Sequence, residues 1–360
     1  MAKLFEKAIR PMLFRVDAER AHELGIKALR LGLVPRPRIG DDVLARIREI
    51  CGPIRRFGLE FSNPLGIAAG FDKNAIIVNQ LAALGFGHVE IGTVTSEPQP
   101  GNEKPRLFRL PDDRALINRL GFNNDGAIKI AARLAGLNRR CVVGVNIGRN
   151  KDVANEDAVE NYLKTFELVH GGADYIAVNV SSPNTPNLRD LQSAENLNLL
   201  LTSIQMKNNE LGAKPLLVKI APDLTDGEIE SIAELCLRVG VSGIIATNTT
   251  VSRDALKTRD IDRFGAGGLS GRPLAERSNK VISQIYKYSK GTLPIIGVGG
   301  IFSPDDAFNK IAAGASLLQA YTGFVYGGPT FATRVVSGLA EILKKRGFAS
   351  LDEAVGSAVT

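Results

Sequence analysis

The residues best suited to chemistry in this chain follow short apolar segments, at the point where each segment ends. Eight segments end in this way, and each delivers an amide, a hydroxyl, an ammonium group or a bare glycine backbone. The side chains are Lys73, Thr93, Asn146, Asn179, Ser182, Lys219, Thr247, Asn248, Tyr321 and Thr322. One asparagine at such a position is usually a turn former, but three beside two lysines indicate one shared polar ligand. No pair of carboxylates converges there, which argues against glycoside hydrolysis.

A glycine-rich segment, 297–300 (GVGG), follows the seventh apolar segment and precedes a helix that we expect to begin near Pro304. Together with the loop at 321–323 it fits a phosphate cradle made of backbone N–H groups and a helix N-terminus. Paired glycines can equally relieve crowding at a strand end, so both interpretations stand. The Rossmann and Walker glycine fingerprints are absent, which excludes those two nucleotide-binding classes.

Lys219 ends the fifth apolar segment and has two chemical interpretations. A buried lysine at a strand end can form a Schiff base with a carbonyl substrate. A cation beside a flavin ring can instead stabilise the negative charge of the reduced flavin. A structural ion pair is the third interpretation.

The framework that must position these residues alternates between apolar segments and helix-sized amphipathic stretches. The predicted strands are 64–69, 88–94, 141–147, 174–180, 215–220, 242–247, 294–298 and 316–321. The predicted helices are 74–85, 125–136, 157–170, 194–209, 225–239, 275–289, 304–313 and 330–346. Short, wholly apolar strands separated by helices indicate a parallel sheet buried on both faces. Eight such units favour a closed (β/α)8 barrel of the α/β class over an open doubly wound sheet.

Residues 1–45 do not follow this alternation, so we expect them to form an N-terminal helical extension to a barrel of residues 46–360. The pattern predicts a basic amphipathic helix over 3–15, which Pro11 should kink or break, and a second helix over 18–32 with Asp17 as its N-cap. This helical pair fits two roles, packing on the barrel or lying on a membrane surface.

Composition narrows the class of protein further. The 360 residues carry a formal net charge of +7, which suits an anionic ligand, an anionic membrane surface or nucleic acid. Nucleic acid is least favoured, because tryptophan is absent and no basic block is interleaved with aromatic residues. The three cysteines and three histidines are scattered, so a metal site lacks its ligand spacing. No apolar run of about 20 residues and no signal peptide is present, which predicts neither a membrane-spanning helix nor export.

Six motifs of the chain together resemble the dihydroorotate dehydrogenase family, in the family's order and spacing across the whole barrel. They are 69–74 (AGFDKN), 118–124 (NRLGFNN), 179–185 (NVSSPNT), 247–249 (TNT), 267–273 (GGLSGRP) and 297–300 (GVGG). The family's catalytic base is a serine in the membrane-associated, quinone-dependent class and a cysteine in the soluble class, and Ser182 stands at the matching position. The N-terminal extension is likewise a feature of the membrane-associated class. The resemblance therefore implies class 2.

The resemblance implies oxidation of dihydroorotate to orotate, with FMN accepting the hydride and a quinone accepting the electrons, in the synthesis of UMP. Ser182 would be the catalytic base, with a proton relay through Thr185 or an ordered water. The implied substrate ligands are Lys73, Asn118, Arg119, Leu120, Gly121, Phe122, Asn179, Asn184, Asn248 and Thr249. The implied FMN ligands are Ala69, Gly70, Phe71, Asp72, Lys73, Thr93, Asn146, Asn179, Lys219, Thr247, Gly271, Gly300, Tyr321 and Thr322. The implied quinone path includes His22, Arg109 and Tyr321.

Three alternatives to this function remain at the level of sequence. They are a soluble-class relative that uses fumarate or a partner subunit, a Schiff-base aldolase built on Lys219, and a binding scaffold without catalysis. We expect the chain to be a bacterial monomer that touches an anionic membrane surface peripherally, on the cytoplasmic side of the inner membrane. We expect neither a metal nor nucleic acid as a partner.

Overall fold

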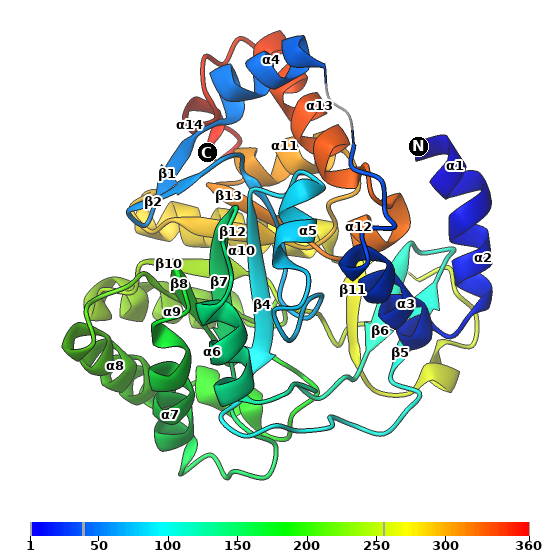
Figure 1. The fold of residues 1–360 in the computed structure, drawn as a ribbon. Helices are drawn as coiled ribbons and strands as arrows, with labels where there is room; N and C mark the ends of the chain where they lie inside the picture. Colours follow the sequence, from blue (N-terminus) through cyan, green and yellow to red (C-terminus); the bar gives the residue numbers. More distant parts are fainter. Residues whose placement is uncertain (1, 38–39, 255, 360) are drawn as a thin grey trace.

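Eight parallel strands form a closed barrel in the computed structural model, which describes residues 2–37, 40–254 and 256–359 (Figure 1). Neighbouring strands pair in parallel register all the way round, and the pairing of the last strand with the first closes the barrel. The strands are β3 (Leu65–Ile67), β4 (His88–Val94), β7 (Val142–Ile147), β8 (Tyr175–Asn179), β9 (Leu216–Ile220), β10 (Gly243–Ala246), β12 (Ile295–Val298) and β13 (Leu317–Ala320). Each lies within a predicted segment, so the predicted (β/α)8 barrel is confirmed.

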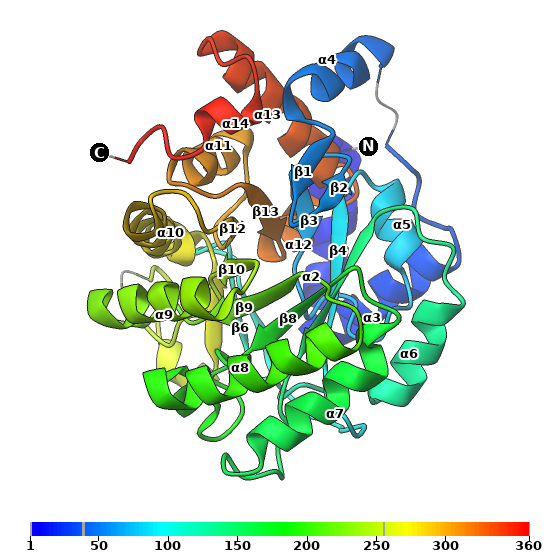
Figure 2. The same cartoon turned by 90° about the vertical axis from the view of Figure 1, so that its left-hand side faces the viewer.

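Helices surround the barrel and cover its outer face (Figure 2). They are α5 (Val78–Ala83), α6 (Ala127–Ala135), α7 (Ala158–His170), α8 (Ala194–Glu210), α9 (Asp226–Val239), α10 (Ala275–Ser289), α11 (Pro304–Ala312) and α13 (Phe331–Lys345). Two of their beginnings are fixed by reciprocal capping boxes, Thr225 with Glu228 and Ser303 with Asp306. Such caps satisfy backbone N–H groups that have no partner inside the helix. All eight predicted helices are therefore present, most of them shorter by one to four residues at an end.

Several short elements were not predicted. The antiparallel strands β5 (Leu107–Leu110), β6 (Ala115–Asn118) and β11 (Gly268–Gly271) form a separate sheet beside the barrel mouth. The hairpin β1 (Ile54–Arg56) and β2 (Leu59–Phe61) lies apart from that sheet, and α4 (Asp41–Cys51) packs against α13. The other short helices are α12 (Thr322–Gly327), α14 (Leu351–Ala354) and the 3-10 turns Leu188–Gln192, Ile261–Phe264 and Arg272–Leu274.

The N-terminal extension is helical, as predicted. A first helix runs without a break from Ala2 to Arg15, through α1 (Ala2–Leu4), a π-helical turn (Phe5–Ile9) and α2 (Arg10–Arg15). Pro11 therefore does not break it, and the irregularity takes the form of the wider π turn just before the proline, which makes room for its ring. Asp17 caps α3 (Ala18–Arg30), as predicted, and its carboxylate accepts hydrogen bonds from the N–H groups of Glu19 and Arg20.

In the extension, α3 lies beside β5, and the π-helical turn Phe5–Ile9 contacts α12 (Figure 1). Residues 38–39 separate α3 from α4 and lie outside the described residues, as do residues 1, 255 and 360. The expected boundary after residue 45 falls inside α4. Within the described ranges, no helix is both long enough and apolar enough to cross a membrane.

Candidate active site

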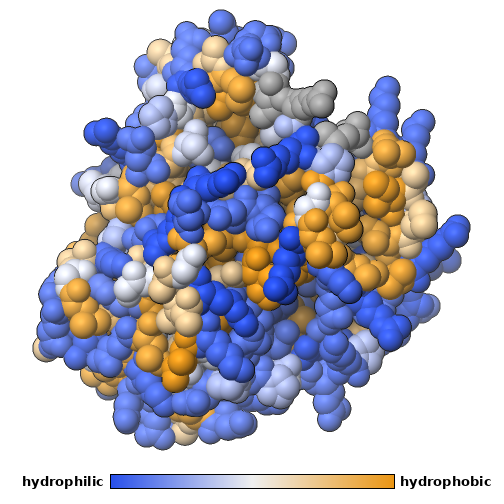
Figure 3. All heavy atoms as spheres, viewed as in Figure 1, coloured by the Kyte–Doolittle hydropathy of each residue, from blue (hydrophilic) through white to orange (hydrophobic). Residues whose placement is uncertain are grey.

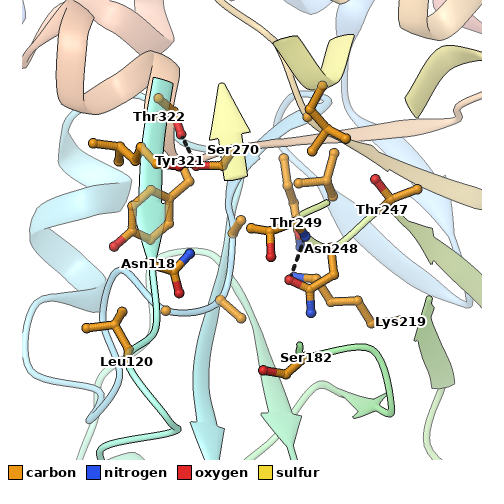
Figure 4. Close-up of a pocket in the computed structure, with 18 of the residues that line it drawn as sticks. Asn118, Leu120, Ser182, Lys219, Thr247, Asn248, Thr249, Ser270, Tyr321 and Thr322 are labelled. Atoms are coloured by element: carbon orange, nitrogen blue, oxygen red, sulfur yellow. Dashed lines mark hydrogen bonds between the residues drawn. The ribbon is translucent and has the colours of Figure 1, made fainter. Parts of the chain in front are cut away.

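The carboxyl ends of the barrel strands open into one shared cavity. Its polar lining comes from the strand ends and from the β5–β6–β11 sheet. The polar lining residues are Lys73, Thr93, Asn118, Asn179, Ser182, Asn184, Lys219, Thr247, Asn248, Thr249, Ser270, Gln319, Tyr321 and Thr322. Figure 4 shows Asn118, Leu120 and Tyr321 on one side of this cavity and Lys219, Thr247 and Asn248 on the other. The structure thus brings together residues that are up to about 250 positions apart in the chain.

Amides from three strands meet at the side chain of Asn179. Its Nδ2 donates to Thr93 Oγ1 and to Asn146 Oδ1, each at 3.1 Å. Its Oδ1 accepts from Asn248 Nδ2 at 3.3 Å and from Ser181 Oγ at 2.9 Å. Buried amides that satisfy one another in this way hold fixed orientations. Asn146 does not itself line the cavity but orients the two residues that do.

Lys219 is paired with a residue that the sequence analysis missed. Its Nζ lies 3.6 Å from Glu90 Oε1, and both side chains are buried. The Glu90 carboxylate also accepts hydrogen bonds from Asn146 Nδ2 (2.9 Å), Tyr175 Oη (3.0 Å) and Gln319 Nε2 (2.8 Å). The sequence did hold a signal for this pair, because Glu90 is a charged residue inside the apolar segment 88–94, and a buried carboxylate needs partners.

Ser182 stands in the loop after β8 and turns its hydroxyl into the cavity (Figure 4). Its Oγ accepts a hydrogen bond from the N–H of Asn184 at 3.2 Å. The Asn184 side chain in turn donates to Asn118 Oδ1 at 3.2 Å, so the loop is joined to β6. Thr185 is buried beside them, does not line the cavity, and its Oγ1 has no hydrogen-bond partner among the described residues.

Lys73 lines the same cavity from the loop after β3. Burial lowers the pKa of its ammonium group to about 8, and the neighbouring carboxylate of Glu19 partly opposes that shift. Asp72 points elsewhere, because its carboxylate accepts from the N–H groups of Ile76 and Ile77 at 2.9 and 2.8 Å. Lys73 therefore supplies the positive charge on this side of the cavity, while Asp72 shapes the loop that carries it.

Two other residues implied by the resemblance also lie off this cavity. Arg119 donates to the carbonyl oxygens of Phe264 and Ala266, and its guanidinium lies over the ring of Phe108 with the carbon 4.6 Å from the ring centroid. Phe71 lines a second cavity instead. The remaining substrate and cofactor positions line the first cavity, apart from Asn146 and Asp72.

Glycines on the floor of the cavity sit where a side chain would not fit. Gly300 has φ +75°, and a Cβ built on it would lie 2.3 Å from Ala275 Cβ. Gly271 has φ +104°, and its Cβ would lie 2.4 Å from the carbonyl oxygen of Arg114. The glycines, which both line the cavity, are thus required by close backbone packing. Beside them, Thr247 Oγ1 is buried and has no partner in the part of the chain described.

A second, larger cavity lies between the extension and the barrel. It is mainly apolar, and it is lined by Phe5, Ile9, Leu13, Phe14, Leu24, Leu29, Val34, Leu84, Phe324 and Val325 among others. Leu107, Leu116 and Tyr321 line both cavities, so these three side chains form the wall between them. Figure 3, in the same view as Figure 1, shows hydrophobic side chains near the centre of the molecule and over α1 and α2.

The three residues expected on the quinone path all line this second cavity. His22 packs edge-on against Phe71 with 4.9 Å between ring centroids, and burial lowers its pKa to about 3, so the ring is neutral near pH 7. Arg109 donates to the carbonyl oxygens of Leu13 and Val16, where α2 ends. It thereby satisfies helix-end carbonyls and fixes the turn into α3.

These features define an α/β-barrel enzyme with a polar and an apolar ligand cavity that share one wall. A sequence model of one family, described as Dihydroorotate dehydrogenase, matches residues 54–343, and the chain belongs to the dihydroorotate dehydrogenase family. A relative from Thermobifida fusca is 50% identical, with 98% of this chain and 96% of the relative covered. A relative from Mycobacterium tuberculosis is 48% identical, with 97% of each covered. Both are named dihydroorotate dehydrogenase (quinone).

Solved structures agree with the sequence comparison. A crystal structure of the dihydroorotate dehydrogenase of Eimeria tenella in complex with ferulenol superimposes with a TM-score of 0.87. It is 39% identical to this chain and covers 95% of both chains. The ligand-free enzyme from the same organism matches equally well, with a TM-score of 0.87. The predicted family and the predicted fold are therefore both confirmed.

Proposed function

We propose that this protein is a quinone-dependent, class 2 dihydroorotate dehydrogenase, which oxidises dihydroorotate to orotate in the synthesis of pyrimidines and passes the electrons to a quinone. The observation that carries this proposal is the similarity, over nearly the whole chain, to relatives named dihydroorotate dehydrogenase (quinone). The paired cavities support it, because a polar ring compound and an apolar acceptor each have a site of matching polarity. The Ser182 hydroxyl and the extension support the quinone-dependent class.

FMN is the cofactor that we propose for the first cavity. Its residues fit such a group, because Thr247 Oγ1 and Gln319 Oε1 are buried at the cavity with no hydrogen-bond partner among the described residues, and because Gly271 and Gly300 leave no side chain in its wall. The residues that would hold it directly are Ala69, Gly70, Thr93, Asn179, Lys219, Thr247, Gly271, Gly300, Tyr321 and Thr322. Bound FMN supplies the hydride acceptor and the relay of electrons. Lys219, held by Glu90, would place a positive charge beside it.

Ser182 is the proposed catalytic base, which takes the proton from C5 of dihydroorotate. A serine hydroxyl is a weak base and needs a path by which its own proton leaves. The N–H of Asn184 holds the Ser182 Oγ in place. The Thr185 Oγ1, which has no hydrogen-bond partner in the described part of the chain, is the proposed next acceptor in that path. The burial of both hydroxyls excludes bulk water from this transfer.

The substrate ligands are proposed from the polar groups that line the same cavity as Ser182. Lys73 would pair with the carboxylate of dihydroorotate, and the amides of Asn118, Asn184 and Asn248 would bind the polar edges of the ring. Several donors converging on one small ring fix its orientation relative to the base. Gly121 and Phe122 add backbone and an aromatic wall.

The apolar cavity is the proposed quinone site. The apolar side chains that line this cavity would keep the apolar tail of a quinone out of contact with water. Tyr321 stands in the shared wall, and Phe71 contacts both His22 and Tyr321, with centroid distances of 4.9 and 5.6 Å. We place the quinone path along these rings, with Arg109 fixing the turn that roofs the cavity.

The extension, residues 1–45, is the proposed point of membrane contact. Met12 and Leu33 are 69% and 70% exposed, and Leu4, Leu24 and Leu31 are exposed as well. Lys3 and Lys7 flank this apolar surface and favour anionic lipid. We propose a monomer bound peripherally to the cytoplasmic face of a bacterial inner membrane, with residues 46–360 as the catalytic barrel.

The visible spectrum of the purified protein tests this function. A yellow protein should lose its flavin absorbance on anaerobic addition of dihydroorotate without NAD, and should regain it with a quinone but not with fumarate. Recovery with fumarate alone would favour the soluble class. A colourless protein that is trapped covalently by borohydride and a carbonyl substrate would favour the aldolase, although a Schiff base on Lys219 would break its ion pair with Glu90.

A further inference from the structure

A buried ion pair joins the N-terminal extension to the barrel. Glu19 on α3 accepts hydrogen bonds from Arg106, which precedes β5, with Arg106 Nη2 2.8 Å from Glu19 Oε1 and Nε 3.1 Å from Oε2. The side chains of Glu19 and Arg106 are 8% and 6% exposed. Opposite charges at such depth stay stable only when both partners are present, because removal of one leaves the other buried and unpaired.

The other side of the Arg106 guanidinium holds the loop that precedes β5. Nη1 donates to the carbonyl oxygens of Pro100 and Asn102, at 2.7 and 2.8 Å. A guanidinium is planar and rigid, so its donors fix the ion pair and the loop in one geometry. The position of Asn102 therefore depends on the position of α3.

Asn102 contacts two of the segments that carry the proposed substrate ligands, the one at Asn118 and the one at Asn184. Its Nδ2 donates to the carbonyl oxygen of Arg119 at 2.9 Å and to that of Asn184 at 3.2 Å. Its backbone N–H donates to the carbonyl oxygen of Leu120 at 3.1 Å. Asn184 follows Ser182 by two residues, and its N–H holds the Ser182 hydroxyl. A continuous series of hydrogen bonds therefore leads from the extension to the serine loop.

Glu19 also acts on the charge of Lys73. The charged groups around Lys73 are Glu19, Glu23, Asp72 and Arg106. Burial lowers the pKa of Lys73, and of the charged neighbours Glu19 raises it most. Arg106 lowers it further. Loss of the Glu19 charge would leave Arg106 uncompensated beside Lys73, which disfavours its ammonium form.

We propose that Glu19 is a positioning residue for the dihydroorotate site, which acts through Arg106 and Asn102 on the loops that bind substrate. The helical extension then has a second task besides the quinone cavity, since it holds the dihydroorotate side in its binding geometry. This inference rests on the proposed function.

Glu19→Gln tests the inference, with Glu23→Gln as the matched control. Glu23 lies one turn along the same helix and is exposed, and it pairs with Lys104 at 3.3 Å. With a soluble dye as electron acceptor, Glu19→Gln should raise the KM for dihydroorotate roughly fivefold or more while kcat stays within about twofold. Calorimetry on the holoenzyme should show the same loss of affinity for orotate, and hydrogen exchange in residues 181–190 should become faster. Glu23→Gln should match the wild type in all three measurements.

Two further variants keep the inference open to contradiction. Asn102→Ala leaves the ion pair in place and should reproduce the weaker orotate binding. Glu19→Asp keeps the negative charge, so its affinity for orotate should lie closer to that of the wild type. This variant also replaces Glu19→Gln as the test if Glu19→Gln folds poorly. Wild-type orotate affinity in Glu19→Gln, or in Asn102→Ala, overturns the inference. Failure of the wild type itself to bind orotate or to react with dihydroorotate overturns the proposed function instead.

Discussion

The two cavities on either side of Tyr321 differ in polarity, in origin and in their relation to the barrel. The cavity at the strand ends is lined by amides, hydroxyls and two lysines, whereas the cavity under α2 and α3 is lined mainly by aliphatic and aromatic side chains. A charged ring compound can replace its hydrogen bonds to water in the first, and an apolar molecule is stabilised in the second. One barrel can therefore serve substrates of opposite polarity when an added helical pair supplies the apolar site.

The largest expected effect lies in the polar cavity. Ser182→Ala removes the proposed base while leaving the flavin-binding residues unchanged, so turnover should fall by roughly 10²- to 10⁴-fold, the usual contribution of a general base. Flavin content, measured from the absorbance of the purified variant, should equal that of the wild type. Loss of flavin together with activity would mean that Ser182 holds the cofactor rather than the proton.

The next effect belongs to the apolar cavity alone. Gly25 on α3 lines this cavity and has open space around an added Cβ, so Gly25→Phe should fill the cavity without disturbing the helix. Oxidation of the reduced enzyme by quinone should slow by roughly tenfold or more, because the quinone can no longer bind in a cavity that the new side chain fills. Reduction by dihydroorotate, followed by stopped-flow absorbance, should stay at the wild-type rate.

A matched control for this variant is Gly227→Phe. Gly227 is an exposed helical glycine on α9, also with open space around an added Cβ. The control should leave both rates unchanged. Equal slowing of the two half-reactions in Gly25→Phe would contradict the separation of the cavities.

A smaller effect is expected from pH, which should change the reaction in the polar cavity but not the reaction in the apolar cavity. Burial lowers the pKa of Lys73 to about 8, so its ammonium form predominates below pH 8 and is lost above it. The kcat/KM for dihydroorotate should therefore fall above pH 8, approaching roughly tenfold per pH unit. Lys73→Met should give a low and flat profile over this range. The rate of reoxidation by quinone should not follow the same pH curve, since His22 is already neutral there.

The smallest effect concerns the outer surface of the extension. Leu33→Glu should weaken binding to anionic lipid vesicles by a few-fold, because it removes an exposed apolar contact and adds a charge of the same sign as the lipid. Leu199→Glu on α8 is the control, since Leu199 is 60% exposed and lies far from the extension. Sedimentation with vesicles measures both. Equal binding by both variants would move the membrane contact away from Leu33.

The barrel could be predicted because each strand is a short apolar segment with a helix-sized interval after it. The buried strands and the capping residues Asp17, Thr225 and Ser303 are local signals, and local signals survive in one sequence. The strands β5, β6 and β11 were missed because each has only four residues, and β11 in addition pairs with β6 from 150 to 156 positions away. The helix α4 was missed as well, although its segment is amphipathic.

The site was predictable to a different degree in its two parts. Residues at the strand ends, such as Lys73, Asn179 and Lys219, follow from the rule that active sites of such barrels lie at the carboxyl ends of the strands. The partners that hold them do not, since Glu90 lies inside a strand and Arg106 pairs with a residue 87 positions away. Long-range ion pairs leave no periodic signal in a sequence. Their absence from the prediction is a consequence of topology, which only the folded chain reveals.

The separation of the two cavities is tested most directly by a two-step mixing measurement on the wild-type enzyme. The protein is first reduced with dihydroorotate and then mixed with a quinone in the presence of excess orotate, while the return of flavin absorbance is followed. If orotate occupies the polar cavity only, as we propose, the rate of return should be the same with and without it. A rate that falls in proportion to orotate concentration would show that both compounds compete for one site, and would contradict this account.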